Sequence, residues 1–199
     1  MNPFAADFDH PPGSPKRPNF YYAPYDNSAP PVVSIITPYY NTGEIFLETA
    51  QSVFQQSLQQ WEWLIINDGS DDPEALRVLN LFREKDPRIR VIDLPSNKGL
   101  PAARNKGIQE ARSDLIFFLD SDDLIEPTAL EKMSWCLISY PEFGFCKGFT
   151  VGFGAQKYLS PIGFEAGNLF LTKNPVAMIA MVRREVALSV EGFDKTAIG

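Results

Sequence analysis

Residues 115–123 have the sequence Leu-Ile-Phe-Phe-Leu-Asp-Ser-Asp-Asp, in which five apolar residues precede a turn with three carboxylates. A short apolar run that ends in a turn is typical of a strand buried on both faces of a sheet. Three neighbouring carboxylates repel one another unless a cation or strong donors neutralise them. The stretch therefore predicts a central strand with a divalent metal site at its carboxyl end, formed by Asp120, Asp122 and Asp123. The alternative is a solvated turn in which one Asp caps the next helix.

Strand patterns and helix patterns alternate on both sides of this strand. Further strands are predicted over 32–37, 61–67, 88–94 and 178–182; helices are predicted after Asn41, whose spacing to Glu44 is that of a capping box, and from Asp72-Pro73, Pro101, Glu126-Pro127 and Arg183. After about residue 140 the alternation fades into Gly-rich segments, 144–154 and 160–167, which predict irregular structure and a short strand or two. The alternation predicts an α/β fold, a mostly parallel sheet with helices on both faces.

Ligands of such sheets bind beyond the carboxyl ends of the strands, which directs attention to four loops. The first loop, Thr37-Pro-Tyr39-Tyr40-Asn41, offers a hydroxyl and two aromatic faces, on which a planar base can stack. In the second, the turn at Gly69 directs Asp68 over the sheet edge, where its carboxylate can accept from a base or a ribose hydroxyl. The alternatives are a tyrosine in the core or rim and an ordinary Asp-Gly turn.

The third loop places a turn at Gly99 directly before a helix that carries Arg104. A helix N-terminus and a guanidinium both favour a diphosphate. An ion pair between Arg104 and a surface Glu is the alternative. The fourth loop is the acidic turn itself.

Composition excludes several other classes of function. A net charge of -7 argues against nucleic acid as the main partner. The single histidine, His10, excludes a Cys/His zinc site and a histidine base within the folded region. The chain has neither a dinucleotide-binding Gly-x-Gly-x-x-Gly sequence nor a P-loop. The apolar surroundings of Cys136 and Cys146 favour free, buried thiols over a disulfide.

The two ends of the chain differ from its middle. Residues 1–30 are proline-rich and without hydrophobic period, which predicts an extended arm or linker before a domain over 31–199. The chain stops at Gly199 without a closing helix or strand, as expected of a truncated domain. No apolar run reaches the ~18 residues of a membrane span, and no signal peptide precedes the domain. We expect a cytoplasmic protein, with peripheral attachment at the inner face of the membrane left open.

Four motifs, at residues 35–41, 65–72, 97–105 and 118–123, occur in the order seen in family 2 glycosyltransferases of the GT-A fold, which this chain resembles over about residues 32–199. The segment Gly192-Phe193-Asp194 is similar to another segment of that family. The resemblance implies inverting transfer of a sugar from a nucleotide-diphosphate donor, usually a uridine one, to an acceptor hydroxyl. It also implies a saccharide or lipid-linked acceptor and a role in polysaccharide or glycoconjugate synthesis.

The resemblance assigns roles to individual residues. It implies nucleoside contacts through Thr37, Tyr40 and Asp68, and a diphosphate or base contact through Arg104. Asp120 and Asp122 match the family's DXD pair, with Mn²⁺ or Mg²⁺ as the metal and Asp123 assisting. The full set expected to bind the nucleotide-sugar is Thr37, Tyr40, Asn41, Asp68, Gly99, Arg104 and Asp120.

The acidic catalytic base of similar enzymes would fall beyond Gly199. Donor binding with poor transfer is therefore expected, and a degenerate or truncated nucleotide-sugar-binding module is the alternative function. A nucleotidyltransferase ranks below both, because residues 37–43 contain no basic side chain.

Overall fold

The computed structural model describes residues 23–154, 157–160 and 179–194, and the account below concerns these residues. Their main feature is a six-stranded sheet with the order β3-β2-β1-β4-β8-β5. Its strands are β1 (Val33–Tyr39), β2 (Trp61–Asn67), β3 (Ile89–Asp93), β4 (Leu115–Phe118), β5 (Phe145–Lys147) and β8 (Ala180–Arg183). Strands β3, β2, β1 and β4 are parallel, whereas β8 is antiparallel to both of its neighbours. The mostly parallel sheet expected from the sequence is confirmed.

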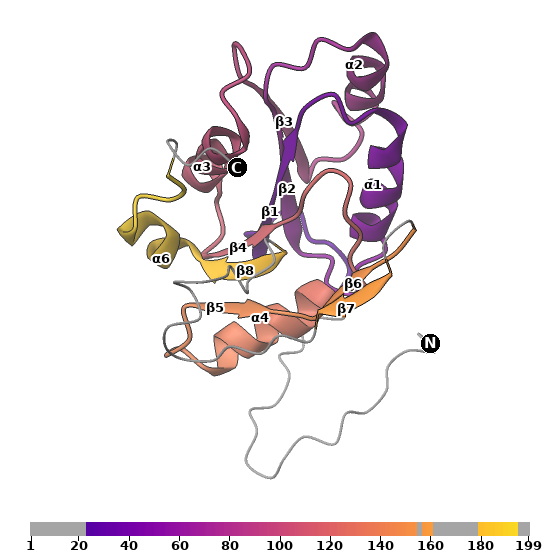
Figure 1. Cartoon of the computed structure of the whole chain (residues 1–199). Coiled ribbons are helices and arrows are strands. Elements are labelled where there is room, and N and C mark those ends of the chain that lie inside the picture. The colour runs from indigo at the N-terminus through magenta and orange to yellow at the C-terminus, as the bar shows by residue number, and fades with distance from the viewer. Residues whose placement is uncertain (1–22, 155–156, 161–178, 195–199) are drawn as a thin grey trace.

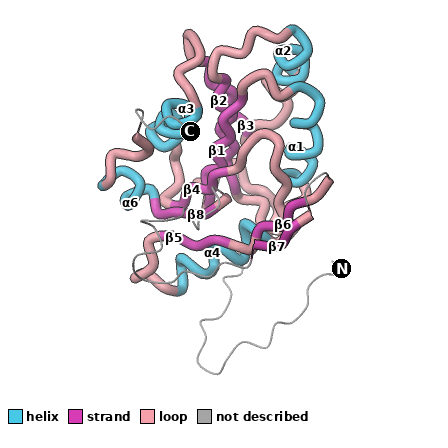
Figure 2. Tube along the Cα trace, viewed as in Figure 1, coloured by secondary structure: helices cyan, strands magenta, loops and turns pink. Residues whose placement is uncertain are grey.

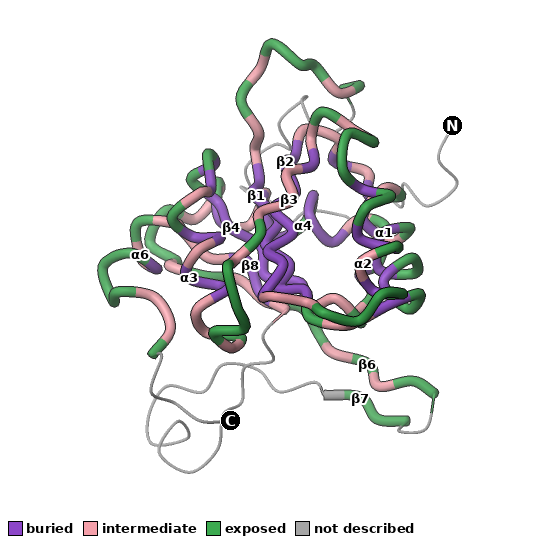
Figure 3. Tube along the Cα trace, turned by 90° about the horizontal axis from the view of Figure 1, so that it is seen from above, coloured by how far each residue is buried: buried purple, intermediate pink, exposed green. Residues whose placement is uncertain are grey.

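Helices cover both faces of the sheet, as predicted (Figure 1). On one face lie α1 (Phe46–Phe54), α2 (Pro73–Asn80) and α4 (Ala129–Ser139); on the other lie α3 (Leu100–Glu110) and α6 (Arg184–Ser189). Every residue of β1 and β2 is buried because neither face meets solvent. A view along the sheet shows these buried strands between the two helical layers (Figure 3). Double-sided burial explains why the central strands are continuous apolar runs rather than alternating ones.

A two-stranded hairpin stands apart from the main sheet (Figure 2). It consists of β6 (Thr150–Gly152) and β7 (Tyr158–Ser160), which pair antiparallel. A short strand or two was expected in the Gly-rich part of the chain; up to residue 160 the structure has three, β5, β6 and β7. The expected irregular structure over 161–167 and the start of the last predicted strand at Met178 lie outside the described residues.

Helix starts were predicted with mixed success. The Asp72 side chain caps α2 by accepting from the N–H of Ala75, with Pro73 at the first helical position, as expected. The capping box at Asn41 is wrong: Thr42 precedes a 3₁₀ turn (Gly43–Ile45) and makes no side-chain cap. The last long helix begins at Ala129 rather than Pro127, since the Glu126 carboxylate instead accepts from Thr128 in a preceding turn.

The described part of the proline-rich arm, residues 23–30, lies against the main domain. The Gln60 side chain donates to the carbonyls of Asp26 and Ala29, both at 2.9 Å. The guanidinium carbon of Arg88 lies 5.0 Å from the ring centroid of Tyr25. Both cysteines are free thiols and half-buried. Over the described ranges, no helix combines the length and apolar character needed to cross a membrane.

Candidate functional site

A cavity of about 330 Å³ lies at the carboxyl ends of the parallel strands, where the four predicted loops meet. It is lined by Pro38, Tyr39, Tyr40, Asp68, Asn97, Gly99, Leu100, Asp120, Ser121 and Asp122. Each loop contributes at least one residue, although the first and last are more than 80 positions apart in the sequence. The sheet therefore assembles one site from sequence segments that were singled out separately.

Asp68 holds the second and third loops together. Its side chain is buried, and its two oxygens accept from the backbone N–H groups of Lys98 and Gly99, both at 2.8 Å. Gly99 is the N-cap residue directly before α3, with a φ of +85°, and its N–H points back to the carboxylate. Asp68 thus lines the cavity while fixing the turn before α3.

Gly69 permits this close approach of the two loops. It has a φ of +71°, and a Cβ added there would lie 2.5 Å from the backbone N of Asn97 and 2.6 Å from the carbonyl carbon of Ser96. Only a residue without a side chain fits between the loops in this conformation. Gly69 is therefore required for the close packing of two backbone segments as well as for the turn after Asp68.

The acidic turn at the end of β4 is held from two directions. Arg104 Nη2 donates to Asp120 Oδ1 at 2.7 Å, and the Arg104 side chain is 6% exposed. On the other side, Thr49 donates to the carbonyl of Ser121 at 3.0 Å, and the hydroxyls of Thr42 and Ser121 lie 2.6 Å apart. These contacts fix the turn without using the carboxylate of Asp122, which is exposed.

Asp123 differs from the other two carboxylates of the turn. Burial, and then the charges of Asp120 and Asp122, raise the pKa of Asp123 to about 6, against the opposing effect of Arg104. Asp120 and Asp122 line the 330 Å³ cavity, whereas Asp123 lines a separate, larger pocket. Within the described ranges, no three His, Cys, Asp or Glu side chains are arranged to hold a metal ion. The three predicted metal residues are therefore divided between two cavities.

Three predicted nucleotide-sugar contacts, Thr37, Asn41 and Arg104, do not line the small cavity. The Thr37 side chain is fully buried, and its hydroxyl accepts from the indole N–H of Trp63 at 2.9 Å, so it faces the core. The Asn41 side chain accepts from the backbone N–H groups of Asp71 and Asp72 and joins the first loop to the second. The Thr37 hydroxyl is hydrogen-bonded within the core, and the Asn41 amide is hydrogen-bonded to the neighbouring loop. Both side chains therefore support the site without lining the cavity.

Arg104 donates to Asp120, which lines the cavity, and is not paired with a surface Glu. Its Nε is buried and has no hydrogen-bond partner among the described residues. Its guanidinium carbon lies 5.4 Å from the ring centroid of Phe193. The arginine therefore retains one unsatisfied donor next to the acidic turn.

Asn105 and Phe193 are parts of the site that sequence reasoning missed. The Asn105 side chain donates to the carbonyl of Phe193 and accepts from its N–H, both at 2.8 Å. The Phe193 ring packs edge-on against Phe118, with 5.2 Å between centroids. Asn105 follows Arg104 in the third motif, and Phe193 belongs to the Gly-Phe-Asp segment, so both motifs were visible but their pairing was not.

Comparison with known proteins gives one family match and several structural neighbours. The sequence model of glycosyl transferase family 2 matches residues 34–134. The O-antigen biosynthesis protein RfbC of Myxococcus xanthus is 32% identical over 172 residues, which cover 82% of this chain and 14% of that protein. The putative teichuronic acid biosynthesis glycosyltransferase TuaG of Bacillus subtilis is 40% identical over 102 residues, covering 51% of this chain and 40% of TuaG.

Solved structures share the fold at low sequence identity. S. aureus TarS (residues 1–349) aligns with a TM-score of 0.64 and 22% identity over 84% of this chain and 51% of that one, and it has also been solved with UDP and with UDP-GlcNAc. The mannosyltransferase PcManGT of Pyrobaculum calidifontis, solved with GDP-Man and Mn²⁺, aligns with a TM-score of 0.61 and 19% identity over 91% of this chain and 52% of that one. The chain thus spans about half or less of the relatives described here.

Proposed function

This chain belongs to glycosyl transferase family 2 and has the GT-A fold, and from that premise we propose that its 330 Å³ cavity binds the nucleoside diphosphate of a sugar donor. The observation that carries the proposal is the convergence of all four loops on one cavity. Its volume lies within the range of ~300–1,000 Å³ usual for small-molecule sites. Its lining combines an aromatic face with carboxylates, as a nucleotide bound through a metal requires.

The nucleoside is assigned to the side of the cavity formed by Tyr40 and Asp68. Tyr40 is 47% exposed and so has a ring face available for stacking. Each oxygen of Asp68 accepts one backbone N–H, which leaves each oxygen a further lone pair for a base N–H or a ribose hydroxyl. UDP is the proposed nucleotide, supported by the TarS structures with UDP and UDP-GlcNAc.

The diphosphate is assigned to the acidic turn, through a Mn²⁺ or Mg²⁺ ion held by Asp122 and Asp120. The donor set fits such an ion: Mg²⁺ is usually bound by one or two carboxylates together with substrate phosphates, and this one turn carries the carboxylates of Asp120, Asp122 and Asp123. When bound, the ion would supply Lewis-acid stabilisation of the departing diphosphate. Arg104 holds one oxygen of Asp120 in place through a hydrogen bond of 2.7 Å.

The proposed reaction is transfer with inversion at the anomeric carbon. The acceptor oxygen forms a bond to that carbon while the bond from the carbon to the diphosphate oxygen breaks. The diphosphate leaves with the electron pair, and the acceptor proton passes to a base. We place this base beyond Gly199. Because a base contributes roughly 10²- to 10⁴-fold to the rate, we expect the 199-residue chain to bind donor and to transfer the sugar poorly.

Calorimetric titration of UDP, with and without Mn²⁺, tests the donor site. The titration is made on the chain, on Asp122→Ala, and on Asp114→Ala as a matched control. Asp114 is exposed and precedes β4, at the opposite end of the same strand from the cavity. We expect UDP binding that depends on Mn²⁺, is weakened about tenfold or more in Asp122→Ala, and is unchanged in the control.

Equal affinity in all three proteins would remove the assignment of the diphosphate to the acidic turn. GDP is titrated in parallel because PcManGT was solved with GDP-Man. Tighter binding of GDP than of UDP would keep the site and replace the proposed nucleotide. If neither nucleotide bound, a module without donor recognition would be the better description of this chain.

A further inference from the structure

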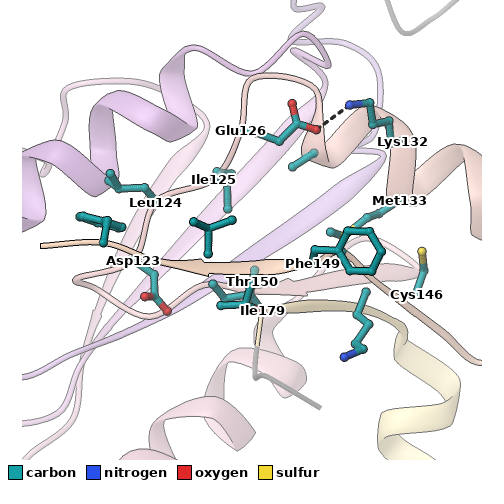
Figure 4. Close-up of a pocket in the computed structure, with 15 residues that line it drawn as sticks. Asp123, Leu124, Ile125, Glu126, Lys132, Met133, Cys146, Phe149, Thr150 and Ile179 are labelled. Carbon is teal, nitrogen blue, oxygen red and sulfur yellow. Dashed lines mark hydrogen bonds and ion pairs between the residues drawn. The ribbon is translucent and has the colours of Figure 1, made fainter. Parts of the chain in front are cut away.

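A second pocket, of about 670 Å³, lies on the other side of the acidic turn (Figure 4). It is formed by the segment that leads from the turn into α4, by α4 itself, and by the chain around β5 and β6. Asp123 lies at one end of the pocket, and Met133, Phe149 and Cys146 lie toward the other. Asp122, the adjacent residue, lines the donor cavity. One four-residue turn therefore separates two cavities.

The walls of the second pocket are mainly apolar. The apolar side chains of the lining include Ile125, Met133, Phe149, Val151 and Ile179. Among the charged groups, Glu126 and Lys132 form an ion pair at 2.9 Å. Burial, and then the adjacent Cys136, raise the pKa of the Cys146 thiol to about 12, so that it stays protonated and uncharged. Most hydroxyl groups of a bare saccharide would lose water here without gaining a partner, which is unfavourable.

The apolar lining continues onto an exposed surface. Phe149 is 72% exposed, Val151 63% and Phe153 62%, and all three also line the pocket. On the paired strand β7, Leu159 is 61% exposed. Contiguous exposed apolar side chains of this kind mark ligand grooves, membrane contacts or protein contacts. Here the surface is continuous with a pocket that reaches Asp123, the neighbour of Asp122 in the proposed donor site, and this continuity favours a ligand.

We propose that the second pocket binds the acceptor and that the acceptor carries a hydrocarbon chain. The hydroxyl-bearing end of the acceptor lies at Asp123, next to the donor, and the hydrocarbon extends along Ile125 and Met133 toward Phe149. This inference rests on the proposed function, because without a donor in the neighbouring cavity the pocket has no reaction to serve. It selects a lipid-bearing acceptor over a free saccharide on the chemistry of the walls.

Two probes that differ only in their hydrocarbon test the proposal. The affinities of n-octyl β-D-glucopyranoside, kept below its micelle-forming concentration, and of methyl β-D-glucopyranoside are measured on the 199-residue chain by ligand-observed NMR titration. Binding is expected to tighten about tenfold for every two methylene groups that leave water. We therefore expect the octyl glucoside to bind at least about tenfold more tightly than the methyl glucoside.

Variants locate the binding. Phe149→Ser and Val151→Ser change exposed residues and should not affect folding, and each is expected to weaken octyl glucoside binding about fivefold or more. Leu81→Ser is the matched control: Leu81 is 48% exposed, follows α2, and lines neither pocket. UDP binding is measured on the same samples and should be unchanged in all three variants.

The outcomes separate this proposal from the proposed function. If UDP binds but the two glucosides have equal affinities, or if Phe149→Ser and Val151→Ser have no effect, the acceptor assignment fails and the donor site stands. If the octyl glucoside binds as expected but no nucleotide does, the proposed function fails and the acceptor assignment falls with it. If sedimentation shows a dimer that Phe149→Ser dissociates, the apolar surface is an interface between copies of this chain and the proposal is overturned.

Discussion

The two cavities that flank the acidic turn differ in origin as well as in chemistry. The 330 Å³ cavity is lined by loops from the carboxyl ends of parallel strands, and polar side chains fix its shape. The 670 Å³ pocket lies between residues 123–133, which lead into and include part of α4, and the chain after residue 140, where the strand–helix alternation has faded; its walls are mainly apolar. The polar site therefore follows directly from the sheet topology, which brings the loops at the strand ends together. The apolar site depends instead on how the later segments of the chain pack. Substitutions in each region should therefore have separable effects.

Among substitutions of residues at the two cavities, the largest effect is expected from Gly69→Ala, which disrupts only the polar cavity. Its Cβ would lie 2.5 Å from a backbone atom of the neighbouring loop, and its φ of +71° is unfavourable for alanine. We expect the free energy of unfolding to fall by about 3 kcal/mol or more and UDP affinity to fall with it. Urea denaturation and calorimetry measure the two quantities.

Gly43→Ala is the matched control for this change. Gly43 has a φ of +67°, but nothing lies within 4 Å of an added Cβ. Only the backbone strain remains, so a loss of about 1 kcal/mol is expected. Equal losses in the two variants would show that the close approach of the loops at Gly69 is unimportant.

Ile125→Ala should have the next largest effect, and it should be confined to the apolar pocket. Ile125 is buried in the core cluster but faces the pocket on one side, so the loss of stability is expected near the low end of the usual range, about 2 kcal/mol. UDP affinity should not change. Ile65→Ala, in a central strand and fully enclosed, serves for comparison and should cost about 4 kcal/mol. A drop in UDP affinity in Ile125→Ala would show that the two cavities are not independent.

The smallest effect is expected from Asn105→Ala, which releases the Gly-Phe-Asp segment from α3. Two hydrogen bonds to the backbone of Phe193 are lost, and we expect a loss of about 1.5 kcal/mol. UDP affinity should fall several-fold, because Phe193 no longer packs against Arg104. Thermal unfolding and calorimetry measure these changes. Asn80→Ala, which removes one exposed contact to Arg83, should be neutral; an equal effect there would argue against a special role for Asn105.

Much of the fold was predictable because its signals are local. Apolar runs identified the central strands, and Asp72-Pro73 identified the start of α2. Where the prediction failed, the side chain forms a hydrogen bond with a residue far away in the sequence instead of the local contact expected from the pattern. Asn41 has capping-box spacing but bonds to residues 71 and 72 instead. Thr37 was predicted to end its strand and to contact the nucleoside. In the structure its hydroxyl accepts from the Trp63 indole and faces the core.

The sequence by itself determined the class of fold, the edge of the sheet where the candidate site lies, and the four loops that meet there. These follow from hydrophobic period and turn residues, which act over a few positions of the chain. Only the tertiary structure decided the partners: Asp68 with the loop 30 positions away, Arg104 with Asp120, and Asn105 with Phe193, 88 positions apart. It also decided that Asp123 faces an apolar pocket while Asp120 and Asp122 face the donor cavity. Such pairings depend on how whole strands and helices are placed, and that placement is set by packing over the entire domain.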